Sequence, residues 1–169
     1  MKRTTIVLLA ALALSAAGCG PGKPKEISKA ARAEAAQNAS EAEFASQIRD
    51  WGRAESLLSR SVELDPENSQ YWLHLGVIRR RLNNTSGARK AYERARDLLR
   101  TDYKRDKSSP APLLVEIEVC ILLGKPDDAK KVLEMAKREH GDDPNVRAFV
   151  DNNVLQKMME NPDLKSIGL

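Results

Sequence analysis

Six residues in the middle of the chain constrain its fold more than any other feature. They are Trp72, Leu75, Gly76, Ala88, Tyr92 and Ala95. The second half of this set recurs 34 residues earlier and 41 residues later, at Ala54, Leu58 and Ser61 and at Ala129, Leu133 and Ala136. A fixed period of this length is typical of stacked helical arrays, in which each unit buries its apolar face against the next.

The composition favours helix over sheet. Aromatic residues make up only 4% of the 169 residues, whereas the helix-favouring Ala, Leu, Glu, Arg and Lys are abundant. No stretch alternates apolar and polar residues as a half-buried strand would. We therefore predict an all-α domain with helices at about residues 51–64, 70–82, 88–100, 110–123 and 145–159, and with another helix that follows a turn at 124–127 and reaches residue 140. A helix-compatible stretch at 27–48 precedes them.

The recurring pattern resembles the tetratricopeptide repeat (TPR), over about residues 35–141. The resemblance implies an all-α, TPR-type α-solenoid of antiparallel helix hairpins with a C-terminal capping helix. Within a helical domain at 27–160, we expect repeats at about 35–68, 69–102 and 110–143 and the capping helix at 145–159. A polar insertion at 103–109 accounts for the longer second spacing, and residues 161–169 are expected to be a flexible tail.

Three residues depart from the family's pattern. Arg79 stands where an aromatic residue is usual, Arg100 where a proline is usual, and Ile117 where glycine or alanine would let helices approach closely. The first hairpin offers mainly alanine at its packing positions. We therefore expect the second repeat to be the best-formed unit of the array.

The first 26 residues indicate export and tethering rather than a part of the fold. A basic start precedes an apolar run at 6–17 that is too short to span a bilayer, and small residues then lead to Cys19. Residues 1–18 resemble a bacterial lipoprotein signal peptide, which makes Cys19 the lipid attachment site and residues 19–26 a tether. The resemblance implies a membrane anchor, and Gly20 in place of aspartate implies the periplasmic face of the outer membrane. The alternative is an ordinary signal peptide cleaved nearby.

The sequence offers little catalytic chemistry. It contains no glycine-rich phosphate loop, no paired metal-ligand spacing and no nucleophile elbow. His74 and His140 lie 66 residues apart, and Cys120 stands among aliphatic residues as a small buried side chain would. We therefore expect no enzyme activity, no cofactor and no metal. Residues 19–169 carry 26 basic and 24 acidic side chains, so no nucleic-acid partner is indicated.

The resemblance also implies a concave groove lined by the first helix of each hairpin. Carried over to this sequence, it places in a partner-binding groove Leu73, His74, Val77, Arg80, Arg81, Leu114, Glu118 and Ile121. An apolar stripe with arginines suits an amphipathic or extended peptide. The alternative for Ile121 and its neighbour Leu122 is that they pack on the capping helix.

Charge is distributed unevenly along the chain. Residues 34–70 hold eight acidic and three basic side chains, whereas residues 79–107 hold eleven basic and four acidic ones. Either these charges pair with neighbours on a solvated surface, or the basic segment meets an acidic partner or anionic lipid headgroups.

These features predict a membrane-anchored TPR scaffold that binds protein partners. Its expected role is in the assembly of a bacterial envelope complex, as a pilotin-like, secretion or pilus accessory factor. The alternative is an adaptor that recruits a periplasmic enzyme such as a cell-wall hydrolase.

Overall fold

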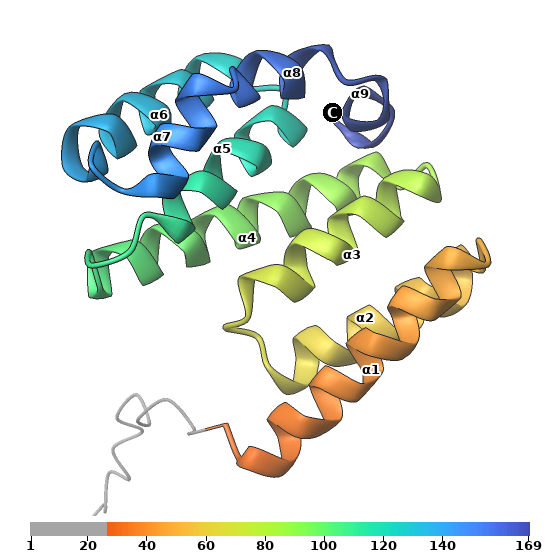
Figure 1. Ribbon diagram of the computed structural model, residues 1–169. Helices are drawn as coiled ribbons and strands as arrows, with labels where there is room; N and C mark the ends of the chain where they lie inside the picture. The colour runs from red at the N-terminus through yellow and green to blue at the C-terminus, as the bar shows by residue number, and fades with distance from the viewer. Residues whose placement is uncertain (1–26) are drawn as a thin grey trace, which may run out of the picture.

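The computed structural model of the chain describes residues 27–169, which form helices and turns and no strand. The helices are α1 (Lys29–Gln47), α2 (Trp51–Leu64), α3 (Ser69–Arg81), α4 (Thr85–Arg105), α5 (Ala111–Leu122), α6 (Pro126–His140), α7 (Pro144–Asp151), α8 (Val154–Glu160) and α9 (Pro162–Ile167) (Figure 1). The predicted all-α array of helix hairpins is confirmed. The signal peptide, Cys19 and the tether lie outside the described residues.

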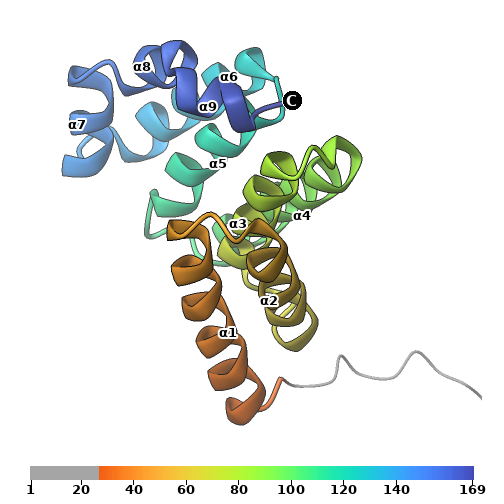
Figure 2. The same cartoon turned by 90° about the vertical axis from the view of Figure 1, so that its right-hand side faces the viewer.

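The first six helices form three antiparallel hairpins that stack in chain order. α1 pairs with α2, α3 with α4 and α5 with α6, while α2 packs on α3 and α4 on α5 (Figures 1 and 2). Each hairpin therefore buries one face against its neighbour, as a solenoid requires. None of the helices within residues 27–169 combines the length and the hydropathy that a bilayer span needs.

Polar side chains fix the starts of α2, α3 and α4. Asp50 accepts a hydrogen bond from the backbone N–H of Arg53 (3.1 Å), and Asn84 accepts one from Gly87 (2.9 Å). At α3 the cap is Asn68, which accepts from a first-turn N–H at 3.0 Å. These caps satisfy N–H groups that have no partner inside the helix.

The same turn closes each of the three hairpins. Its left-handed residue is Arg49, Asn83 or Gly124, with φ of 60°, 60° and 67°. The N–H of the following residue donates to a carbonyl five residues back, in the pairs Asp50–Ala45 (2.9 Å), Asn84–Arg79 (2.8 Å) and Lys125–Cys120 (2.8 Å). This is the helix ending of Schellman type. Because the three left-handed residues are spaced by 34 and 41 positions, the repeat governs the turns as well as the packing.

The second hairpin has the tightest interior. Tyr92 of α4 is fully buried, and its ring lies against Gly76 of α3 so closely that a Cβ at residue 76 would overlap ring atoms. In the first hairpin the fully buried positions are mostly alanine, at Ala35, Ala45 and Ala54. Large fully buried side chains thus lie in the second and third hairpins, with Tyr92 and Leu75 in the second and Leu113, Ile117 and Leu122 in the third.

Two predicted boundaries are wrong. The expected capping helix at 145–159 is two helices, because Asn153 takes a left-handed conformation (φ 51°) between α7 and α8; asparagine tolerates this conformation better than most residues. Helix α4 also continues past Arg100 into the polar insertion. Its last turns are held because Tyr103 is buried beside Leu113 and Ile117.

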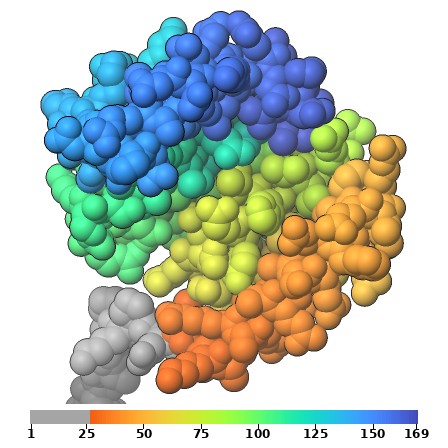
Figure 3. Space-filling model, viewed as in Figure 1, coloured from red at the N-terminus to blue at the C-terminus, as the bar shows by residue number. Residues whose placement is uncertain are grey.

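The expectation of a flexible tail at 161–169 is also wrong. Asn161 caps α9 by accepting from the N–H of Asp163 (2.8 Å), and Ile167 is 9% exposed in a cluster with Leu73 and Leu122. Residues 162–169 therefore fold back over α3 and α5, where the blue C-terminal segment lies against the green helices in the space-filling view (Figure 3).

Candidate peptide-binding groove

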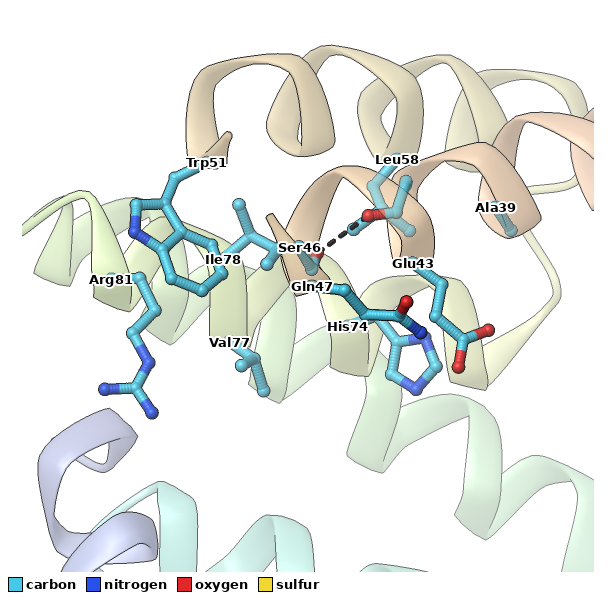
Figure 4. A pocket seen from close by; sticks show the side chains of 11 residues that line it. Ala39, Glu43, Ser46, Gln47, Trp51, Leu58, His74, Val77, Ile78 and Arg81 are labelled. Carbon is cyan, nitrogen blue, oxygen red and sulfur yellow. Dashed lines mark hydrogen bonds between the residues drawn. The ribbon is translucent and has the colours of Figure 1, made fainter. Parts of the chain in front are cut away.

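The concave side of the array carries an open groove between α1 and α3. The groove has a volume of about 400 Å³ and is closed at one end by Trp51 of α2 (Figure 4). Its apolar lining comes from Ala39, Ala42, Trp51, Leu58, Val77 and Ile78. Its polar lining comes from Glu43, Ser46, Gln47, His74 and Arg81.

The groove exists because α1 presents small residues to α3. Ala39 and Ala42 leave space that longer side chains would fill, so the larger residues of α2 and α3 form the floor. The Ser46 hydroxyl does not compete for this space, because it donates to the carbonyl of Ala42 at 2.7 Å in its own helix. An apolar floor with a polar rim is the usual chemistry of a ligand groove.

The rim carries opposite charges toward the two ends of the groove (Figure 4). Glu43 stands on α1, and His74 and Arg81 stand on α3 (Figure 4). Although His74 is exposed as a whole residue, burial of its ring lowers its pKa, against the opposing attraction of Glu43. The groove therefore holds one acidic and one basic rim group at neutral pH, with a neutral imidazole between them.

The structure brings only part of the predicted groove together. Of the residues predicted for a partner-binding groove, His74, Val77 and Arg81 line the open groove. Leu73 does not, because it is buried in the cluster that contains Tyr92. Arg80 is also engaged elsewhere, since its Nε donates to the carbonyl of Gly168 at 2.7 Å.

The predicted contribution of α5 is absent from the open groove. Leu114 and Ile121 pack with the cluster that includes α8 side chains, which supports the packing alternative for Ile121. Glu118 is half-buried, and burial raises the pKa of its carboxyl group. Leu122 is fully buried. These positions are unavailable because α8 and α9 cover α5.

The sequence-based reasoning missed the residues from α1 and α2. Ala39, Gln47 and Trp51 were not placed in the groove, although Trp51 directly follows the cap residue Asp50 and the alanine-rich face of α1 was visible. An alanine face opposite bulky residues is a signal for a hollow. The bulky side chains that α1 does carry, Phe44 and Ile48, are each 59% exposed.

The basic segment is partly paired within the fold. Arg79 Nε lies 3.1 Å from Glu55, and Arg100 Nε lies 2.5 Å from Glu116. Both arginines are departures from the family's pattern, and each joins a helix of one hairpin to a helix of the next. The pairings favour the interpretation of this segment as an internally paired surface.

Within residues 27–169 no three His, Cys, Asp or Glu side chains gather as metal ligands would. Cys120 is fully buried, and burial raises the pKa of its thiol to about 11. A thiol of this kind is protonated at neutral pH and is a poor nucleophile.

Comparison with known proteins agrees with this fold. Residues 88–151 match the family model described as tetratricopeptide repeat. The type III secretion translocator chaperone SycD of Yersinia enterocolitica, in an alternative dimer, is 19% identical, with 79% of this chain and 94% of that chain covered and a TM-score of 0.51. At this identity the likeness shows a shared helical fold.

Two further solved structures are less similar. SycD in complex with a peptide of the translocator YopD is 19% identical, covering 74% of this chain and 88% of that chain with a TM-score of 0.47. PcrH from Pseudomonas aeruginosa is 21% identical, covering 75% and 89% of the two chains with a TM-score of 0.44. Comparison with curated proteins finds no match.

Proposed function

We propose that this chain is a non-catalytic scaffold that binds a segment of a protein partner in the open groove between α1 and α3. The observation that supports the proposal is the groove itself, with its apolar floor and with Glu43 and Arg81 on its rim. Such a groove fits an extended or amphipathic segment that offers aliphatic side chains to the floor. The TPR match over residues 88–151 supports a binding role by analogy of fold.

The finer proposal concerns place and role. Residues 1–18 and Cys19 support a lipid-anchored protein on the periplasmic face of a bacterial outer membrane. In that position the scaffold would act in the assembly of an envelope complex such as a secretion or pilus machine. The Cys19→Ser variant tests the anchor: it should move to the soluble fraction and lose labelling by palmitate. Retention of the variant in the membrane would contradict the anchor and leave the groove proposal standing.

Site-specific photo-crosslinking in cells tests the groove. A benzoylphenylalanine at Gln47 or at His74 lies on the rim, whereas one at Lys90 lies on an exposed part of α4 outside the groove. We expect the two rim positions to give the same adduct and Lys90 to give none. Equal adducts at all three positions would contradict the groove assignment.

A binding assay with the purified protein and its purified partner then makes the test quantitative. The partner identified from the adduct should bind the Val77→Asp variant on the order of tenfold or more weakly, because one desolvated charge on the floor costs at least 1.4 kcal/mol, or about tenfold. Lys90→Asp provides the control, since it introduces an aspartate on an exposed part of α4 outside the groove and changes the net charge by −2, more than Val77→Asp does. Equal losses in both variants would show a general charge effect rather than groove binding.

A further inference from the structure

The part of the concave side next to the open groove is filled by the chain itself. Three consecutive residues at the end of α9 are held through their backbone. The Tyr92 hydroxyl donates to the carbonyl of Ile167 at 2.8 Å, and Arg80 Nε donates to the carbonyl of Gly168 at 2.7 Å. The N–H of Leu169 donates to the carbonyl of Leu122 at 2.8 Å.

The donors and the acceptor come from three different helices. Arg80 belongs to α3, Tyr92 to α4 and Leu122 to α5, so the segment lies across the array and not along one helix. Backbone hydrogen bonds of this kind, with side chains entering between them, are how a groove holds an extended peptide. The segment is therefore bound as a ligand would be, although it is part of the same chain.

The sequence of the segment matches the surface under it. Ile167 is buried beside Leu73, and Leu169 packs against the same cluster. Gly168, between them, is extended, and a Cβ there would lie 3.1 Å from the carbonyl oxygen of Leu164 and 3.6 Å from that of Leu122. The surface thus accepts the two aliphatic side chains at ordinary contact distance. The close contact at Gly168 lies within the segment, at the carbonyl of its own residue Leu164, so a segment that makes the same turn needs a small middle residue.

Several features indicate that the segment can leave without unfolding the array. Helix α9 has six residues, too few to be stable alone, and the extended residue Asn161 separates it from α8. A surface pocket of about 290 Å³ remains beside it, lined in part by Ile121, Met159 and Leu164. One buried and two half-buried aliphatic side chains, with three tertiary hydrogen bonds, are a small attachment compared with the interior of a hairpin.

We propose that residues 162–169 are a displaceable internal ligand, and that an aliphatic–glycine–aliphatic segment of a partner chain binds the same α3–α5 surface in competition with them. The inference rests on the proposed function and names the partner's recognition sequence. Displacement lengthens the concave site, because α9 borders the open groove: Asp163 lines a shared pocket with Arg81 and Trp51. The partner would then run from α5 to α1.

A peptide supplied in trans tests the proposal. The probe is a fluorescent synthetic peptide with the sequence of residues 161–169, and the protein is the full chain in detergent. The opened variant carries Ile167→Ser and Leu169→Ser. These substitutions weaken the packing of the chain's own segment on the α3–α5 surface and leave that surface unchanged. We expect this variant to bind the probe with an affinity on the order of tenfold or more above that of the wild-type chain. In the wild type, the molecules whose own segment covers the surface cannot bind the probe, and this fraction lowers the apparent affinity.

Two controls make the result specific. A probe carrying Gly168→Val should bind the opened variant more weakly, since a side chain there crowds the carbonyl of Leu164 in the turn that the bound segment makes. Adding Arg80→Ala to the opened variant should also weaken the unmodified probe. An opened variant with wild-type helical circular dichroism that binds the probe no better than the wild-type chain would overturn the proposal.

Hydrogen exchange of the wild-type chain gives a second, independent readout. The Leu169 amide should exchange on the order of tenfold or more faster than the buried amides of α3 and α4, since it opens locally. Equal protection would show that α9 leaves only on global unfolding, and the proposal would fail. The crosslinks at Gln47 and His74 do not depend on this result, so failure of the inference and failure of the proposed function are separable.

Discussion

The Tyr92 ring lies so close to Gly76 that a Cβ on residue 76 would overlap the Cδ1 and Cε1 atoms of the ring. This contact joins α3 to α4 and leaves Tyr92 fully buried. It also sets the position of the Tyr92 hydroxyl, which donates to Ile167. The closest helix contact in the fold thus determines where the C-terminal segment can bind.

Gly76→Ala should therefore destabilise the chain. Overpacking of a close-packed interior costs about 1–3 kcal/mol, which exceeds the gain of about 1 kcal/mol that alanine has over glycine in a helix. Urea unfolding followed by circular dichroism measures the change. Gly52→Ala in α2 is the matched control, because nothing lies within 4 Å of a Cβ there, and it should stabilise slightly. The same sign in both variants would contradict the packing argument.

The Gly76–Tyr92 contact was predictable, because spacing along the chain reports which faces of two consecutive helices meet. The position of α9 was not. Residues 161–169 have no helical periodicity of their own, and their partners Arg80 and Tyr92 lie 88 and 75 residues away in the sequence. Only the α3 side of the open groove was predictable, because the repeat pattern identifies α3. The α1 side was not, because the hollow depends on how short the α1 side chains are.

The hairpin turns predict a stabilising substitution. Arg49 adopts φ 60° in the turn of the first hairpin, and the residues at the same place in the other two hairpin turns are Asn83 and Gly124. A non-glycine residue in this conformation costs roughly 1 kcal/mol. The Arg49 side chain is exposed and forms no ion pair with another residue of the range 27–169. Arg49→Gly should thus raise the free energy of unfolding by about 0.5–1 kcal/mol.

The reverse substitution, Gly124→Ala, provides the comparison. It should destabilise, because φ is 67° and a Cβ would lie 2.9 Å from the carbonyl oxygen of Leu169. Thermal unfolding of both variants measures the pair. If Arg49→Gly lowers the stability, the Arg49 side chain has an interaction that outweighs the strain of its backbone.

The Arg100–Glu116 pair predicts an asymmetric response to substitution. Glu116 is 3% exposed, and its partner Arg100 reaches it from the surface at 2.5 Å. Arg100→Ala leaves a buried carboxylate without its cation, and because the arginine is partly solvated we expect a loss of about 1–3 kcal/mol.

The double variant Arg100→Met with Glu116→Met should recover most of this loss, because two apolar side chains of similar volume replace the pair. Chemical denaturation of the single and double variants decides the point. Additive losses in the double variant would mean that Glu116 is stabilised by contacts other than Arg100.

A pH-dependent stability should follow from Tyr103. Its hydroxyl donates to Glu139 at 2.6 Å and lies 3.0 Å from His140 Nε2. The hydrogen bond from Tyr103 is the main cause of a lowered Glu139 pKa, with Arg138 and Lys107 acting in the same direction. A lowered folded-state pKa stabilises the fold above the ordinary carboxyl pKa, and the benefit is lost as the pH falls through the lowered value.

Tyr103→Phe should accordingly lower the stability most at neutral pH, and the difference from the wild type should shrink as the pH falls below about 4. Arg138 and Lys107 remain in the variant, so the pH dependence is reduced and not abolished. Unfolding at a series of pH values measures it. Tyr71→Phe is the control, since it removes a phenolic hydroxyl without touching Glu139, and its effect should not vary over this range.

Cys120 can report opening of the core. Burial raises the pKa of its thiol to about 11, so at pH 8 the thiolate fraction is on the order of a hundredfold below that of a free cysteine. In the Cys19→Ser background Cys120 is the one remaining thiol of the sequence. A disulfide reagent should therefore label the Cys120 thiol at least on the order of a hundredfold more slowly in the native chain than in the chain unfolded in urea.

The same labelling distinguishes global from local opening. Cys120 lies on α5 in the cluster with Ile117 and Ala129, and not in the cluster that contains Ile167. Gly76→Ala should speed the labelling of Cys120 in proportion to its loss of global stability. The opened variant, Ile167→Ser with Leu169→Ser, should leave the rate near that of the wild type, because only the C-terminal segment is released. Equal acceleration in the two variants would mean that α9 and the core open together.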